Sequence, residues 1–400
     1  MSAGSHAGPP ALLLGRLNVA RALGAGGIAS HIASPLPDEL AFASRFCTGR
    51  IKLPPLDDRD AVVDALLRAG ERIDGAPLYF GDDDYLDLVQ DRREALSRRF
   101  RFILSDPEVA RALIHKRRFA AFARRRGLPV PRALEWGELA TWRGAVLVKP
   151  KAKIAWENSA VLAQLLGGAG KARVFESGRE VIANAAAARL RDDVLFQEYV
   201  AGGDRQLWSF HGYADERGEL LAWFIGHKIR TWPELTGASS FLELAHNPEL
   251  ERIGRDAAER ATLKGVFKLD FKQDAVTGRY SLLEVNARYN LWHYLGARNG
   301  INLPRVAYDY LVHGRRPQPT RYRCTHRWVD LRVDRQAYRQ LHAQGRLSLA
   351  GWLWSLARTP KVYTLLAWDD PLPFARYWLR RIKRLPQLTT RLTRWLFTAS

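Results

Sequence analysis

Residues 282–290 read LLEVNARYN, and this stretch decides the fold that we expect. Side chains alternate between the two faces of a strand, so every second residue shares a face. One face of the expected strand is apolar and holds Leu283, Val285 and Ala287. The other face is strongly polar and holds Glu284, Asn286 and Arg288. The alternation predicts a strand that packs on a core and presents either a solvated edge or a binding site.

The preceding residues 266–272 show the same alternation, and DAVTG at 274–278 joins the two stretches. Phe267, Leu269 and Phe271 share one face, whereas Lys268, Asp270 and Lys272 share the other. A hairpin centred near Thr277 places Asp270 opposite Glu284. Two carboxylates that face each other across a ladder repel, unless a cation lies between them.

The ligands on this polar face are carboxylate and amide oxygens, which suit Mg²⁺ or Mn²⁺ rather than zinc. Mg²⁺ held by one or two carboxylates generally also binds phosphate oxygens, so the hairpin predicts a nucleotide nearby. The alternative is a solvated polar face on an edge hairpin, because alternation with charged residues is common in such strands.

Composition narrows the class of protein without naming a partner. The chain has 400 residues and a formal charge of +20, which favours nucleotides, nucleic acid or an anionic membrane surface. Its two cysteines, Cys47 and Cys324, exclude a disulfide framework and a clustered zinc site, and they fit a reducing cytoplasm. We expect no signal peptide and no membrane-spanning helix, and no recognised motif supports specific binding of nucleic acid.

Short apolar runs alternate with helical patterns over roughly the first hundred residues, which predicts a parallel, Rossmann-like sheet. Residues 107–134 predict a basic amphipathic helix with an extended exit. Further strands are expected within 144–150, 194–210 and 222–232. Asn247 is expected to cap a helix over 247–265. The chain from 316 onwards is expected to be helical, Trp-rich and basic.

Six motifs occur along the chain in an order and at spacings that resemble the ATP-grasp superfamily, and most closely its predicted carboligases of the carboxylate–amine ligase type. They are HKRRFAAFARRRGLPVP (115–131), VLVKP (146–150), FQEYVAGGD (196–204), GHKIRTWP (226–233), FKLDF (267–271) and LLEVNAR (282–288). The resemblance covers about 105 to 315, and the preceding segment resembles the domain that usually comes before this fold.

The resemblance implies an α/β chain with an α+β ATP-grasp fold. We expect a Rossmann-like domain over 1–106, a small lobe over 107–195, a large lobe over 196–315 and a helical C-terminal appendage over 316–400. The implied cofactors are ATP and Mg²⁺ or Mn²⁺, with two ions. The implied metal ligands are Asp270, Glu284 and Asn286, with Glu284 bridging the ions.

The implied ATP contacts lie in the earlier motifs: Lys116, Lys149, the hinge residues Gln197, Glu198 and Val200 beside adenine, and Asp204 at the ribose. Arg288 would stabilise the charge that develops on the acyl phosphate, Lys228 would reach the γ-phosphate, and Lys268 would assist. Lys116 follows His115, where the family more often has Asp. Each residue also has a plainer interpretation: a surface lysine for Lys116 or Lys228, a strand end for Lys149, and a turn cap for Asp204.

One departure concerns the phosphate loop. The family often has glycines directly after the residue at Lys149, whereas here GGAGK (167–171) comes later. Backbone amides of such a loop can bind phosphates, with Lys171 as the expected functional residue, or the loop can be a flexible turn. Downstream, the aromatic stretch 289–304, including Tyr289, Trp292, His293 and Arg298, either lines a substrate pocket or packs a helix.

The C-terminal residues 371–400 contain seven Arg or Lys, no acid and several Trp and Leu. Such a segment either contacts an anionic membrane peripherally, on its inner face, or docks on the protein with a solvated basic face. The implied activity is ATP-dependent ligation, in which a small-molecule carboxylate becomes an acyl phosphate and an amine attacks it. The alternative is a non-catalytic nucleotide sensor or scaffold, either free or associated with a membrane surface.

Overall fold

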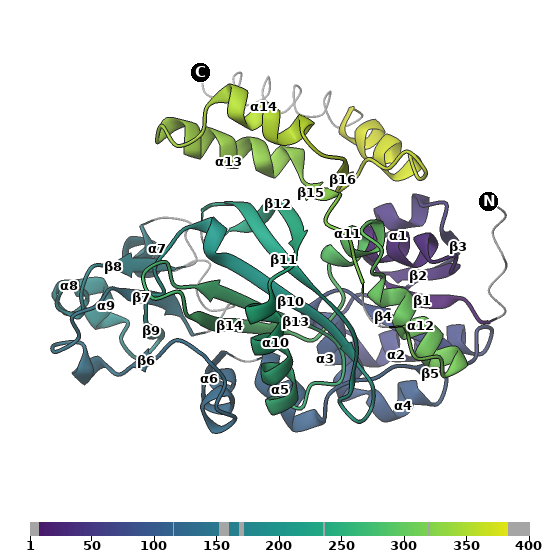
Figure 1. Ribbon diagram of the computed structural model, residues 1–400. Coiled ribbons are helices and arrows are strands. Elements are labelled where there is room, and N and C mark those ends of the chain that lie inside the picture. The colour runs from purple at the N-terminus through teal and green to yellow at the C-terminus, as the bar shows by residue number, and fades with distance from the viewer. Residues whose placement is uncertain are drawn as a thin grey trace, which may run out of the picture.

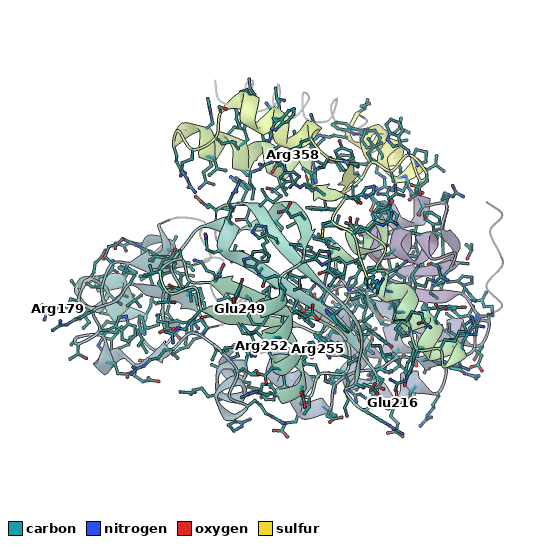
Figure 2. The ribbon with its side chains drawn as sticks, in the orientation of Figure 1. Arg179, Glu216, Glu249, Arg252, Arg255 and Arg358 are labelled. Carbon is teal, nitrogen blue, oxygen red and sulfur yellow. The ribbon has the colours of Figure 1, made fainter. Side chains whose placement is uncertain are left out.

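The computed structural model describes residues 8–114, 116–151, 160–167, 172–234, 237–318 and 321–382. Within these residues three sheets of five, four and seven strands organise the chain (Figure 1). Arg179 of the four-stranded part and Glu216 of the seven-stranded part lie far apart in the same view (Figure 2). The hairpin that contains residues 266–288 belongs to the seven-stranded sheet, which lies between the other two sheets (Figure 1).

The five-stranded sheet is parallel, as the alternating pattern predicts. Its order is β3 (Cys47–Lys52), β2 (Ser30–Ser34), β1 (Ala11–Leu14), β4 (Ala76–Phe80) and β5 (Phe100–Arg101). The helices of this part are α1 (Leu17–Ala25), α2 (Arg59–Gly70), α3 (Asp83–Asp91) and α4 (Arg93–Ser97), with a 3₁₀ turn at Leu40–Ala43. All four residues of β1 are buried, so both faces of the central strand are covered.

The acidic run at 82–84, directly after β4, starts a helix. The side chain of Asp82 accepts a hydrogen bond from the backbone N–H of Tyr85, and Asp83 and Asp84 occupy the first turn of α3. Carboxylates are favoured there because they satisfy free N–H groups and oppose the helix dipole.

The four-stranded sheet is antiparallel and has its own core. Its order is β6 (Ala133–Leu134), β9 (Val194–Glu198), β7 (Val146–Pro150) and β8 (Arg173–Phe175). The associated helices are α7 (Ala160–Leu166), α8 (Gly178–Ala183) and α9 (Ala185–Arg189), with a 3₁₀ turn at Trp136–Glu138. Two helices, α5 (Pro107–Ile114) and α6 (Lys116–Arg125), precede this sheet where one continuous helix was expected, and residue 115 lies outside the described residues.

The seven-stranded sheet contains the expected hairpin at its edge. Its order is β14 (Tyr280–Asn286), β13 (Gly265–Gln273), β10 (Leu207–Ala214), β11 (Leu220–Trp232), β12 (Ala238–Ala245), β15 (Arg327–Val329) and β16 (Lys361–Tyr363). It is accompanied by α10 (Pro248–Arg260), α11 (Trp292–Arg298), α12 (Leu303–His313) and a 3₁₀ turn at Asp204–Gln206. Asn247 caps α10 as predicted, because its side chain accepts from the N–H of Leu250.

The C-terminal region is mainly helical, with α13 (Leu331–Ala343), α14 (Leu349–Ala357) and helical residues 372–382. Strands β15 and β16 attach it to the seven-stranded sheet, a feature that the sequence analysis did not anticipate. The fully buried Arg21 of α1 also pairs with Asp370, at 2.9 Å between Nε and Oδ2. Among the described residues, none of the helices has the length and apolarity needed to cross a membrane.

Candidate active site

The β13–β14 hairpin pairs Asp270 with Glu284, which confirms the predicted register. The register then shifts, because Phe271 pairs with Leu282 and leaves Leu283 as an extra residue. Leu282 is therefore the residue that reaches the core, at 1% exposure, and the expectation that Leu283 anchors the apolar face was wrong.

The polar face of this hairpin is exposed at Glu284, on the edge strand β14, and buried at Asp270, on β13. Asp270 is only 4% exposed, although it lies one strand from the edge of the sheet. Lys268 Nζ lies 2.5 Å from Asp270 Oδ2, and Lys228 Nζ of β11 lies 3.4 Å from Oδ1. Burial alone would raise the pKa of Asp270, but Lys268 and Lys228 lower it to about 2. The site is therefore a buried carboxylate between two amines.

Asn286 occupies the space between the two carboxylates. Its Nδ2 donates to Asp270 Oδ2 at 3.2 Å and to Glu284 Oε1 at 3.1 Å. Its Oδ1 accepts from Arg288 Nη2 at 3.2 Å. The amide thus bridges two anionic groups at the position where a cation would be bound, and a half-turn of the amide presents an oxygen there instead.

The donor set of this cluster fits a hard divalent cation. Among the described residues no three His, Cys, Asp or Glu side chains are arranged so that they could hold a metal ion, so the set consists of two carboxylates and one amide. Asp270 Oδ1 is buried and receives no hydrogen bond from the described residues. A buried carboxylate oxygen with unused acceptor capacity is a suitable ligand for Mg²⁺.

Arg288 reaches this cluster but is held by a residue that the sequence analysis did not assign. Its Nε and Nη2 donate to the two carboxylate oxygens of Asp83 in α3, at 2.5 and 3.1 Å. Burial would lower the pKa of Arg288, but the Asp83 carboxylate raises it, so the guanidinium stays charged. Only the acidic run at 82–84 signalled this contact in the sequence.

The residues implied as ATP contacts fall into separate groups. Lys149 Nζ donates to Gln197 Oε1 at 3.1 Å, between the adjacent strands β7 and β9. Glu198 and Val200 both line a cavity of about 320 Å³ at the hinge. Neither Lys149 nor the carboxylates of Asp270 and Glu284 line this cavity. Lys116 begins α6, but its side chain lies outside the described residues, as does all of Lys171.

Asp204 is 7% exposed and bonds to β11 through both carboxylate oxygens. Oδ2 accepts from the N–H of Thr231 at 2.6 Å, and Oδ1 accepts from Thr231 Oγ1 at 2.7 Å. The structure therefore gives Asp204 a local bonding role, since it ties its turn to β11.

Lys272 is a further candidate that the sequence analysis placed on the polar face without a role. Lys272 is 5% exposed, and its Nζ lies 4.4 Å from the ring centre of Tyr199 in the hinge. Burial lowers the pKa of Lys272 to about 8, against the attraction of Asp204 and Asp274. In the sequence, the position of Lys272 two residues after Asp270 and four after Lys268 indicates that it shares their face of the strand.

The aromatic stretch that follows Arg288 packs the core rather than lining an open pocket. Tyr289, Trp292 and His293 are 4%, 2% and 0% exposed. His293 Nδ1 lies 2.9 Å from the backbone nitrogen of Asn290 and 3.0 Å from its carbonyl oxygen. Burial lowers the pKa of His293 to about 4, so the ring is neutral. The plainer of the two interpretations of these three residues is the correct one.

Solved structures with this arrangement of sheets are numerous. N5-carboxyaminoimidazole synthetase from Staphylococcus aureus matches with a TM-score of 0.58 and 10% identity, over 80% of this chain and 82% of that one. L-amino acid ligase from Bacillus licheniformis matches with a TM-score of 0.53 and 13% identity, over 77% and 75%. The chain has the ATP-grasp fold.

A third ATP-grasp structure is the biotin carboxylase domain of the Hydrogenobacter thermophilus 2-oxoglutarate carboxylase, in complex with MgADP, ADP and bicarbonate. It matches with a TM-score of 0.57 and 16% identity, over 80% of this chain and 74% of that one. Among curated proteins, D-aspartate ligase of Enterococcus faecium is 24% identical over 238 residues. That match covers 56% of this chain and 55% of the ligase, so it spans about half the length of that relative. No protein-family profile matches the chain.

Proposed function

We propose that this protein is an ATP-dependent ligase that activates a small-molecule carboxylate as an acyl phosphate and joins it to an amine. The observation that carries the proposal is the pairing of Asp270 with Glu284 beside Lys268 and Lys228. Phosphoryl transfer depends mainly on positioning and charge neutralisation, which a carboxylate pair and two buried amines supply. The shared fold and the similarity to D-aspartate ligase support the same reaction class.

The proposed reaction has two steps. A carboxylate oxygen of the substrate attacks the γ-phosphorus of ATP, the bond to the bridging oxygen breaks, and ADP leaves with the electron pair. The amine nitrogen then attacks the acyl carbon, the carbon–oxygen bond to phosphate breaks, and the proton of the amine leaves with the phosphate. Arg288 lies beside Asn286 and would bind the oxyanion that forms at the acyl carbon.

Asp270, Glu284 and Asn286 would hold Mg²⁺, with Glu284 shared between two ions. The ions would neutralise the negative charge of the phosphate groups. Lys228 and Lys268 would bind the phosphate oxygens from the opposite side. Lys149, Lys116, Lys171 and the hinge Gln197, Glu198 and Val200 are proposed ATP contacts, as is Asp204 for the ribose. The domain boundaries at 106, 195 and 315 belong to the same proposal.

The proposed reaction would take place in the cytoplasm, which supplies ATP and keeps Cys47 and Cys324 as free thiols. Contact with the inner face of the membrane through residues 371–400 is part of this proposal. The exposed side chains described below extend that contact to a larger surface.

The test is release of phosphate and ADP when the purified chain is incubated with ATP, Mg²⁺ and a panel of amino acids, with amide products detected by mass spectrometry. A ligase produces phosphate only when both a carboxylate and an amine are present. Glu284→Gln should abolish the product, whereas Glu249→Gln, an exposed position on α10 that Figure 2 labels, should not. Binding of ATP without turnover under every combination would instead identify a nucleotide sensor.

A further inference from the structure

The C-terminal region exposes an unusual share of the large apolar side chains. Nine of the fourteen large apolar side chains that are exposed among the described residues lie within 331–382. Trp368 is 88% exposed and Trp354 is 65% exposed, although Trp normally buries most of its surface. An excess of exposed large apolar side chains in one region of a chain is typical of a binding surface.

The helical residues 372–382 dock on the protein through their polar side. Arg380 Nη1 lies 3.0 Å from Asp38 Oδ2 in the N-terminal part. The hydroxyl of Tyr377 accepts from Arg332 Nη1 of α13 at 2.6 Å. Positions 372, 379 and 382 share one face of a helix, and that face points away from these contacts.

This outward face is apolar, and we call it the C-terminal apolar stripe. It comprises Trp368 and, on the helix, Leu372, Trp378, Leu379 and Ile382, which are 60%, 43%, 59% and 57% exposed. A surface helix of a globular protein normally buries its apolar stripe and exposes its charges. Here the arrangement is reversed, which indicates that the stripe has an external partner.

Helix α14 also makes polar contacts with the protein and exposes apolar side chains to solvent. Trp352 Nε1 donates to Asp334 Oδ2 of α13 at 2.8 Å, and the Trp352 ring stacks on Tyr338 at 4.7 Å. Leu349 and Leu353 are each 51% exposed. Helix α13 packs against β11 and β12 of the seven-stranded sheet, and α13, α14 and residues 372–382 form an outer layer of the molecule (Figure 1).

The surroundings of the stripe are strongly basic. Residues 331–382 contain nine Arg or Lys and three Asp. Two of the acids, Asp334 and Asp370, are buried in ion pairs with Arg230 and Arg21, so Asp369 is the one exposed acid in this range. Arg358, at the end of α14, and Arg381 are exposed, and Figure 2 shows Arg358 in this outer layer.

We propose that the C-terminal apolar stripe docks the protein peripherally on an anionic lipid bilayer. Exposed Trp and Leu side chains with flanking Arg match the interface between headgroups and acyl chains, where the rings partition and the guanidinium groups meet lipid phosphates. A second copy would bring two basic faces together. Residues 383–400 carry four Arg or Lys and no acid, so their charge repels the basic surroundings of the stripe as well.

The test is flotation of the full chain with vesicles of phosphatidylcholine alone, or mixed with phosphatidylglycerol, at low and high salt. We expect binding only to the anionic vesicles and weaker binding at high salt. The triple variant Trp368→Ser, Trp378→Ser, Leu379→Ser should lower the partition coefficient at least about tenfold. The matched control is the triple variant Leu36→Ser, Ile182→Ser, Val276→Ser, which changes exposed apolar residues elsewhere and should bind as the wild type does.

Three results would overturn the proposal. One is a lack of binding to any vesicle, and another is binding that the stripe variant leaves unchanged but that Trp395→Ser in the tail abolishes. The third is that the wild type forms a dimer by light scattering and does not bind vesicles, whereas the stripe variant is a monomer. Because ATP turnover is not used as a readout, failure of the proposed ligase activity would leave this test unaffected.

Discussion

Arg288 and Asp83 form a bidentate ion pair although they are 205 positions apart, with Nε–Oδ1 and Nη2–Oδ2 distances of 2.5 and 3.1 Å. The pair joins α3, in the N-terminal part, to the end of the β13–β14 hairpin. Two of the three guanidinium nitrogens are thereby engaged, and Nη1 makes no hydrogen bond with the described residues. Asp83 thus fixes the plane of the guanidinium and leaves Nη1 for a ligand.

Asp83→Ala is expected to raise the KM for the carboxylate substrate about tenfold, because it releases the guanidinium from its fixed orientation. The KM for ATP should change little, since Asp83 contacts neither the hinge nor Lys149. Steady-state kinetics with each substrate varied in turn would measure the split. Asp57→Ala, an exposed acid of the same sheet region, is the control. Equal increases in both KM values would mean that Asp83 stabilises the fold as a whole and does not specifically orient the Arg288 guanidinium.

Glu284→Gln is expected to lower kcat at least about a hundredfold, because the amide cannot supply the negative charge that a divalent cation requires. The Mg²⁺ concentration for half-maximal rate should rise in this variant. Isothermal titration of ATP without metal should give the same affinity as the wild type, which separates loss of the cation from loss of the nucleotide site. An unchanged Mg²⁺ requirement would remove Glu284 from the ligand set.

Lys272→Met is expected to raise the KM for ATP at pH 7, because it removes a buried positive charge that attracts Asp204. In the wild type, burial lowers the pKa of Lys272 to about 8, so the ammonium loses its charge as the pH rises through that value. The wild-type KM for ATP should therefore increase between pH 7 and pH 9, approximately, while that of the variant varies less. Lys52→Met, at an exposed position, is the control, and parallel pH profiles in all three proteins would contradict the expectation.

His293 should make the fold sensitive to acid. Its folded pKa of about 4 lies below the ordinary value of 6.5, so the unfolded chain binds the proton more readily. The contribution of the neutral His293 ring to the free energy of unfolding is therefore fully present above pH 6.5. This contribution, up to about 3 kcal/mol, is lost as the pH falls from 6.5 through 4. In His293→Gln, the free energy of unfolding by urea should depend less on pH over that interval. His342→Gln, at an exposed position, should retain the wild-type dependence.

Local periodicity was sufficient to predict the hairpin, and long-range contacts were not. The alternation over 266–288 fixed which side chains share a face, and the turn length fixed the pairing of Asp270 with Glu284. The bulge at Leu283 has no sequence signature that one chain reveals. Asp83 reaches Arg288 only because two sheets pack together, and the exposed stripe on residues 372–382 depends on which side of that helix docks.

A second bulge connects the candidate site to the C-terminal region. Lys228 pairs with Leu242 and Arg230 pairs with Phe241, so Ile229 is an extra residue and the two cations point to opposite faces of β11. Lys228 meets Asp270, whereas the buried Arg230 donates to both carboxylate oxygens of Asp334 in α13, at 2.8 and 2.9 Å.

Asp334→Ala is expected to cost about 3–5 kcal/mol of unfolding free energy, because it leaves a buried guanidinium without its counter-charge. The variant should also raise the KM for ATP, since a displaced Arg230 moves the bulge that positions Lys228. Asp369→Ala, an exposed acid of the same region, should change stability by no more than about 0.5 kcal/mol. Urea unfolding and ATP kinetics on both variants would measure these effects. A destabilised Asp334 variant with the wild-type KM for ATP would show that the bulge holds Lys228 without help from α13.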